Sequence, residues 1–148
     1  MSTFTRDDFL AYIKAFNAQD YTTQHSFYHP DVTLFIPDVG TLAGSKSIQE
    51  HYRDIHASAE ETIVPILLMI QGPKIFFQMT TYFTYKHDTN NAVHNLRVRR
   101  GDVVRVNIWA LYDVVDGKLK TIVCNLLNVE VLGKVNVKKF VNPPRSLL

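Results

Sequence analysis

Apolar and polar positions follow two different periods along the chain, and the change between them divides the sequence into a helical part and a β-rich part. In the first sixty residues, apolar side chains recur every three or four positions in two segments. This spacing predicts helices over about residues 6–18 and 46–59. A shorter helix is predicted over residues 21–28, which ends before Pro30. Thr5 and Asp8 are placed to cap the first helix, and Ser45 or Ser47 can cap the third. Residues 32–36 alternate with a period of two, which predicts a short strand before the third helix.

From Thr62 onward the sequence is rich in β-branched and aromatic residues. Long strands are predicted over residues 62–71, 74–87 and 102–131, with turns at Gly72-Pro73 and Asp116-Gly117. This order of elements predicts an α+β fold in which three N-terminal helices pack on one face of a curved, mostly antiparallel sheet. Two segments lie outside this pattern: a polar connection over residues 87–102, and a C-terminal tail over residues 133–148 that follows a domain over residues 1–132.

Composition excludes several classes of function. The chain has 148 residues, enough for one domain with a real core. Its net charge of +2 is too small to favour nucleic acid as a partner. Neither a signal peptide nor an apolar run long enough to cross a membrane is present, and Cys124 is the single cysteine, so we expect an intracellular, cytoplasmic protein without a disulfide. The six histidines show no metal-ligand spacing, so neither a metal nor another cofactor is expected.

Two features carry candidate chemistry. Asp38 follows the first strand in the stretch Phe35-Ile-Pro-Asp-Val-Gly40, and it either caps a turn or lies at the mouth of a cavity. On the third predicted helix, a polar stripe runs along one side, and it faces either solvent or the same cavity. The members of this stripe are Gln49, Arg53, His56 and Glu60.

Several segments, taken in order, resemble the NTF2-like superfamily and, within it, the SnoaL-like polyketide cyclases. Residues 27–32 (FYHPDV) are similar to the family's passage from helix to strand, residues 40–52 to its turn into the third helix, and residues 116–119 (DGKL) to the start of its last strand. The similarity spans about residues 4–131. Residues 67–86 (LLMIQGPKIFFQMTTYFTYK) further resemble small fungal isomerases that rearrange rings in meroterpenoid biosynthesis.

The resemblance implies a cone-shaped domain with an apolar cavity, and a homodimer formed through the outer face of the sheet. It also implies that Asp38, Arg53 and Glu60 are catalytic: the two carboxyl groups exchange protons and Arg53 steadies a developing oxyanion. Many SnoaL-like cyclases carry an acid on the last strand, where this chain has Asn125 and Asn128, so the chemistry is expected on the side of the third helix. The residues expected to contact substrate are His25, Tyr28, Tyr52, Trp109 and Asn125.

The sequence thus predicts a cofactor-independent isomerase that acts on a bulky, hydrophobic terpenoid or polyketide-terpenoid in fungal secondary metabolism. Two alternatives remain open at this point. The domain is either a small-molecule-binding module without chemistry, or a dehydratase or cyclase that uses the same carboxyl groups.

Overall fold

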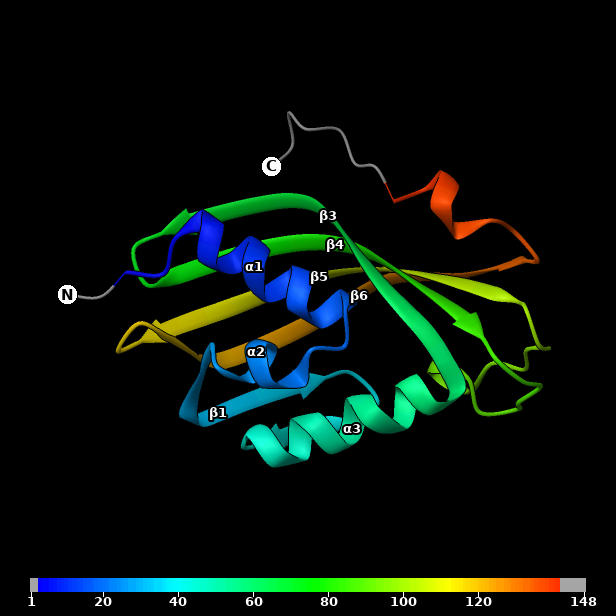
Figure 1. Ribbon diagram of the computed structural model, residues 1–148, viewed down its shortest axis with the longest axis horizontal. Coiled ribbons are helices and arrows are strands. Elements are labelled where there is room, and N and C mark those ends of the chain that lie inside the picture. The colour runs from blue at the N-terminus through cyan, green and yellow to red at the C-terminus, as the bar shows by residue number, and fades with distance from the viewer. Residues whose placement is uncertain (1–2, 142–148) are drawn as a thin grey trace.

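The computed structural model describes residues 3–141, and in that range it contains three α-helices, two short 3-10 helices and one six-stranded sheet (Figure 1). In chain order the elements are α1 (Arg6–Asn17), α2 (Tyr21–His25), β1 (Tyr28–Ile36), β2 (Gly40–Ala43), α3 (Ser45–Ser58), β3 (Ala59–Gln71), β4 (Lys74–Tyr85), η1 (Val93–Asn95), β5 (Val103–Val115), β6 (Lys118–Gly133) and η2 (Val137–Lys139). Within the described residues, no helix has both the length and the apolar character needed to cross a membrane.

The strands are arranged in the order β2-β1-β6-β5-β4-β3, and only the pairing of β1 with β6 is parallel. The predicted α+β class with a curved, mostly antiparallel sheet is therefore confirmed. Three helices lie in the N-terminal part as predicted, and the strand predicted before the third helix is present as β1; β2, which pairs with it in a hairpin before α3, was not predicted. All three helices lie on the same side of the sheet (Figure 1).

The helix starts follow from local hydrogen bonding. At α1 the predicted cap is present: the Asp8 amide donates to Thr5 Oγ1 and the Thr5 amide donates to Asp8 Oδ2, at 3.0 and 2.9 Å. At α3 the predicted serine cap was wrong, because the N-cap residue is Gly44, which has a φ of 88° and no side chain to accept a bond. The hydroxyl of Ser45 is hydrogen-bonded to His25 Nδ1 instead.

The main core lies between the helices and the concave face of the sheet. Phe9 of α1 is fully buried, and its ring meets the rings of Phe77 and Tyr112 edge-on at 4.7 and 5.1 Å between centroids. Ile48 anchors α3 in the same cluster. This packing holds the helices over one part of the sheet and leaves space between α3 and the far ends of β3 to β6.

The convex face of the sheet is covered at one end by the chain's own C-terminal segment. Val137, Phe140 and Val141 pack on this face, where the Phe140 ring stacks on Tyr82 at 5.2 Å. The first part of the predicted 133–148 tail therefore folds onto its own domain, whereas residues 142–148 lie outside the described residues.

The connection between β4 and β5 is ordered by contacts with the rest of the domain. Thr89 and Val98 form an isolated β-bridge within it. Ala92 and Val98 are buried against residues of β4 and β5, with exposed fractions of 5% and 2%. The segment is thus part of the folded structure, and η1 at its centre lies over the space described next.

Candidate active site

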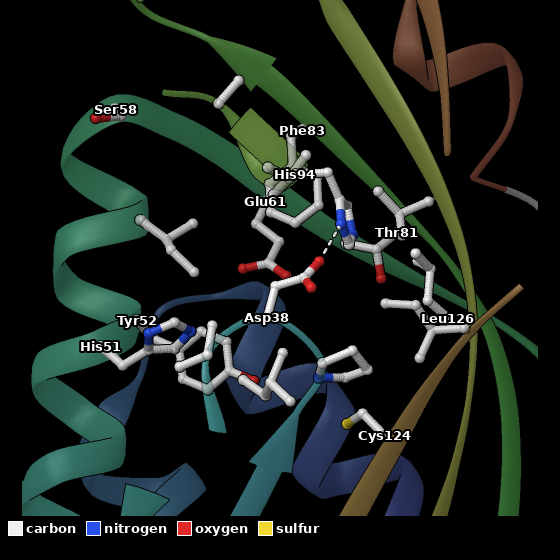
Figure 2. Close-up of a pocket in the computed structure, with 18 of the residues that line it drawn as sticks. Asp38, His51, Tyr52, Ser58, Glu61, Thr81, Phe83, His94, Cys124 and Leu126 are labelled. Atoms are coloured by element: carbon white, nitrogen blue, oxygen red, sulfur yellow. Dashed lines mark hydrogen bonds and ion pairs between the residues drawn. The ribbon is translucent and has the colours of Figure 1, made fainter. Parts of the chain in front are cut away.

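A cavity of about 450 Å³ lies between α3, the concave face of the sheet, the β1–β2 turn and the β4–β5 connection (Figure 2). Its deep wall is mostly apolar and aromatic, with Phe16, Ile63, Met79, Phe83 and Ile108 among its residues. Its size and lining are typical of sites that enclose a small hydrophobic molecule. Asp38, Val39 and residues 91–95 line its mouth.

Asp38 is held at this mouth by the shape of its turn. The Val39 amide donates to the Ile36 carbonyl at 3.1 Å, and Asp38 has a φ of 70°. Pro37 followed by a residue with positive φ is typical of a type II turn, and Asp is one of the few side chains that adopt this conformation readily. Its carboxylate does not cap the turn. Oδ2 instead accepts a hydrogen bond from His94 Nδ1 at 2.7 Å, which joins two segments 56 residues apart (Figure 2).

Glu61 is the carboxyl group of the cavity interior. It is 8% exposed, and Oε1 lies 3.0 Å from His56 Nε2. Burial raises the pKa of Glu61, while its bond to His56 opposes that rise. In Figure 2 its carboxyl group points into the space that Asp38 and His94 border. The cavity therefore has a buried carboxyl group whose pKa is raised above its usual value, and a second carboxyl group that is 69% exposed at the mouth.

The structure does not place Arg53 and Glu60 where the sequence predicted. Both are exposed, and neither lines the cavity. The reason is that β3 begins at Ala59, so side chains alternate with the period of a strand from there. Glu61 pairs with Phe83 on the cavity side, and Glu60 pairs with Thr84 on the other face. The guanidinium carbon of Arg53 lies 6.0 Å from the centre of the Tyr21 ring.

The face of α3 that borders the cavity is not the predicted polar stripe. It carries His51, Tyr52, Asp54, Ile55 and Ser58. Desolvation lowers the pKa of His51, although the charge of Asp54 opposes this, so His51 is neutral at pH 7. Burial raises the pKa of Tyr52 well above its usual value, which keeps the phenol protonated as a hydrogen-bond donor.

Of the five predicted substrate-contacting residues, Tyr52 lines the cavity. Asn125 also borders it, but it pairs in register with Trp109, so its side chain shares the convex face with Trp109. The other three do not line the cavity. Tyr28 is buried in the core, where its hydroxyl bonds to that of Tyr12 at 2.9 Å. Trp109 lies on the convex face against Phe76, with ring centroids 5.4 Å apart. His25 packs edge-on against Tyr28 beside Ser45. The pattern of β-branched and aromatic residues did not show which face of each strand is concave.

Sequence reasoning missed Glu61, His51 and His94 as cavity residues. A signal for Glu61 exists in retrospect: it alternates with Ile63 in the run Ala59–Val64, and Ile63 is an apolar core position. His94 could not be found this way, because its place depends on how a sixteen-residue connection folds back over the mouth.

Carboxyl groups are the main charged side chains that line the cavity. Its lining includes three carboxyl groups and two histidines but no lysine or arginine among the described residues. Cys124 also lines it, and burial raises the pKa of its thiol to about 12. A thiol with that pKa is protonated at neutral pH and is a poor nucleophile. Among residues 3–141, no three His, Cys, Asp or Glu side chains are placed to hold a metal ion together.

The profile of the SnoaL-like domain family matches residues 9–122, which is most of the chain. The chain belongs to the SnoaL-like family. No curated protein is significantly similar to it in sequence. The match spans α1 through the first residues of β6, so it includes the cavity walls except for the part that β6 contributes at Cys124, Asn125 and Leu126.

Solved structures show the same fold at low sequence identity. A protein assigned as a polyketide cyclase from Xanthomonas campestris pv. campestris is 19% identical, with a TM-score of 0.69, over 89% of this SnoaL-like chain and 90% of its own. TerC, crystallised with polyporic acid, is 18% identical, with a TM-score of 0.62, over 80% and 88%. A protein assigned as a ketosteroid isomerase from Kribbella flavida is 12% identical, with a TM-score of 0.61, over 93% and 88%. The fold is thus shared by proteins assigned to enzymes of small-molecule isomerisation and cyclisation.

Proposed function

We propose that this SnoaL-like domain is a cofactor-independent isomerase that moves protons within a bulky hydrophobic substrate. The observation that carries the proposal is the pairing of two unlike acid-base groups in one apolar cavity: buried Glu61, and the Asp38–His94 pair at the mouth. A buried carboxyl group and a carboxylate–histidine pair that border the same cavity can serve as an acid and a base on one substrate.

The roles follow from the hydrogen bonds. Asp38 accepts from Nδ1–H of His94, so Nε2 of His94 is the ring nitrogen that can take a proton from a substrate C–H or O–H group. Glu61 retains a proton that it can give to a carbonyl oxygen or to carbon at the other end of the substrate. Tyr52, which stays protonated, can donate to a developing oxyanion and takes the role that the sequence assigned to Arg53.

The proposed substrate is a terpenoid or polyketide-terpenoid intermediate of fungal secondary metabolism. This rests on the resemblance of residues 67–86 to meroterpenoid isomerases and on the size of the cavity. The excess of carboxyl groups in the described lining adds one restriction. An anionic substrate would meet like charges without a lysine or arginine to pair with, so we expect the part of the substrate that enters the cavity to be uncharged.

We also propose that the domain forms a two-fold symmetric homodimer through the convex face of its sheet. Beside the end covered by the C-terminal segment, an apolar row crosses five strands in register. Its members are Phe35, Val123, Leu111, Phe76 and Met69. Phe35, Leu111 and Met69 are 41%, 49% and 53% exposed in a single copy. A second copy of the same row would cover it by a self-complementary contact.

The enzyme is tested with oxygenated meroterpenoid intermediates, incubated in D₂O and followed by mass spectrometry. We expect a product that differs from the substrate only by exchanged deuterium. Glu61→Gln is expected to lower turnover by roughly 10² or more, because it removes a proton donor and keeps the shape. Asp38→Asn is expected to lower it by a similar factor. Glu60→Gln is the matched control, a neighbouring carboxyl on the other face of β3, and should keep full turnover.

Three results would change the proposal. Full turnover in Glu61→Gln, or a loss confined to Glu60→Gln, would remove the assigned mechanism. A product lighter by one water would show a dehydratase of the same fold. Substrates that bind without any deuterium exchange would show that the domain is a binding module.

A further inference from the structure

A chain of three hydrogen-bonded side chains connects the cavity to the outer side of the helices. It begins at Glu61, whose Oε1 lies 3.0 Å from His56 Nε2. His56 is 5% exposed, and its other ring nitrogen, Nδ1, lies 2.8 Å from the hydroxyl of Tyr21. Tyr21 is the first residue of α2 and is partly exposed. Both ring nitrogens of a buried histidine are thus engaged, one toward the cavity and one toward the surface.

We propose that Tyr21 and His56 form a proton relay that reloads Glu61 from solvent on the helix side of the protein. This proposal rests on the proposed function, in which Glu61 gives up a proton in each turnover. A bulky substrate that fills the cavity blocks the route through the mouth. Glu61 then needs a second route for its next proton, and His56 and Tyr21 supply the only hydrogen-bonded one that the described residues show.

Proton transfer along this chain reverses the direction of each of its hydrogen bonds. With Glu61 ionised, Tyr21 donates its O–H to His56 Nδ1, and Nε2–H donates to Glu61. A proton then arrives at the Tyr21 oxygen from solvent, the phenol proton moves to Nδ1, and the Nε2 proton moves to Glu61. In the reloaded state Glu61 donates to Nε2 and Nδ1–H donates to Tyr21. One proton enters at the surface, one reaches the cavity, and each heavy atom keeps its normal valence. The imidazole then has to return from the Nδ1–H to the Nε2–H tautomer, after the product has left, before the relay can deliver the next proton.

The surroundings of His56 isolate this route. The rings of Phe16 and Tyr52 lie against it, with centroids 5.8 and 6.0 Å away, and Tyr21 stacks on it at 6.1 Å. These rings pack around the imidazole and limit the access of solvent to it. The backbone carbonyl of His56 is taken by Lys86 Nζ at 2.7 Å.

Other titratable groups face the relay from each neighbouring element. On α3, His51 interacts electrostatically with His56, and Arg53 lies over the Tyr21 ring. The charge of Glu61 contributes to the raised pKa of Tyr85 on β4 and of Cys124 on β6. It contributes to the raised pKa of Tyr52 as well. None of these groups replaces a member of the chain, because the hydrogen bonds to His56 are made by Tyr21 and Glu61.

The relay can be tested on the free protein, without substrate, by NMR. Nitrogen-15 shifts of the His56 ring report which nitrogen carries the proton, and the carbon-13 shift of the Glu61 carboxyl reports its ionisation. As the pH falls, the Glu61–His56 pair takes up a proton. We expect His56 Nδ1 to become protonated with the same midpoint pH. Nδ1 shifts that stay constant while Glu61 titrates would overturn the relay.

Tyr21→Phe separates the relay from packing, because it removes the hydroxyl and keeps the ring that stacks on His56. In this variant we expect kcat to fall roughly 10-fold with KM unchanged, and small proton donors such as imidazole to restore it. Tyr82→Phe is the matched control, since its hydroxyl lies on the convex face away from the cavity. Full kcat in Tyr21→Phe, or a loss that imidazole does not restore, would contradict the proposal.

The two proposals fail in different ways. If Glu61→Gln is inactive while Tyr21→Phe is fully active, the acid-base function stands and the relay is wrong. If Glu61→Gln keeps full turnover, the proposed function fails first, and the NMR result then shows only whether the hydrogen-bonded chain transfers protons at rest.

Discussion

At the scale of single residues, the decisive feature is a carboxyl group buried without a lysine or arginine beside it. Glu61 is bonded to a histidine and is surrounded by apolar and aromatic side chains. Most buried carboxyl groups are paired with a cation, because an unpaired buried charge is costly. A carboxyl group held in this way costs stability when it ionises, and it is a strong sign of function.

This cost can be measured. Burial raises the pKa of Glu61 above its usual 4.5, so the folded state keeps this proton at a pH where the unfolded chain has lost it. The protonated Glu61 contributes its full stability below the pKa of the unfolded state, about 4.5. This contribution is lost as the pH rises through the pKa of Glu61 in the folded state. We therefore expect the stability of Glu61→Gln relative to the wild type to rise as the pH increases above about 4.5, measured by urea unfolding at each pH.

Glu60→Gln provides the control for this series, because Glu60 is exposed on the other face of the strand. Its stability relative to the wild type should not vary with pH in the same way. A constant difference between Glu61→Gln and the wild type across this range would show that Glu61 ionises in the folded protein as it does in water.

The same pair of residues shows how far sequence reasoning reaches at this scale. Asp38 was found because it follows an alternating strand and a proline. The structure places Glu61 rather than the predicted Glu60 on the cavity wall, and the pattern around Ala59, which fits a helix period and a strand period equally well, did not distinguish the two. A shift of one residue in a strand moves a side chain to the other face. The choice between Glu60 and Glu61 depends on where helix α3 stops, and tertiary packing decides that.

At the scale of elements, the β1–β2 turn and the β4–β5 connection meet at the cavity mouth through one side-chain bond. Asp38, His94 and Asn95 all have positive φ values, at 70°, 57° and 57°. Both segments are thus bent sharply where they meet. The strands themselves were predictable from period and turn residues, but this meeting was not, since it depends on a pairing between distant parts of the chain.

His94→Ala tests the role of this contact. The pair is partly exposed to solvent, so we expect the free energy of unfolding to fall by less than about 1 kcal/mol. Turnover should fall roughly 10²-fold, because the proposed base is removed. Urea unfolding and product formation, measured on the same preparation, distinguish the two effects.

Val98→Ala is the complementary variant in the same connection. Val98 is 2% exposed and packs against β4 and β5. Its truncation should cost about 2 kcal/mol of stability, from lost burial and the cavity left behind. If His94→Ala instead destabilised the protein as much as Val98→Ala, the contact at the mouth would be mainly structural.

At the scale of the whole molecule, the fold was predictable because several independent signals agree. Helical periods come first, long strands follow, and glycine turns separate them. The concave and convex faces were harder to assign, because both are apolar: Phe76 and Phe77 are neighbours on β4, yet Phe77 is buried in the core and Phe76 lies against Trp109 on the convex face. An apolar residue is expected to be buried within one copy of the protein. When both faces of a strand are apolar, the alternation does not show which face packs on the helices and which is covered by a second copy.

The convex face provides the last prediction. Leu111 lies in the middle of the apolar row, between Phe76 and Val123, and is 49% exposed in one copy. The wild type is expected to have twice the monomer mass by light scattering at micromolar concentration. Leu111→Glu should yield the monomer, because two carboxylates would meet near the symmetry axis without a cation between them.

Ala11→Glu is the control for this experiment. It adds the same charge at an exposed position of α1, on the helix side of the molecule, and should leave the mass at that of the dimer. Circular dichroism must show the same helix and strand content in both variants, since Leu111 lies in the middle of β5 and a folding defect would also change the mass. A wild-type protein with the mass of one copy would remove the proposed dimer, and the apolar row would then be free to contact another partner.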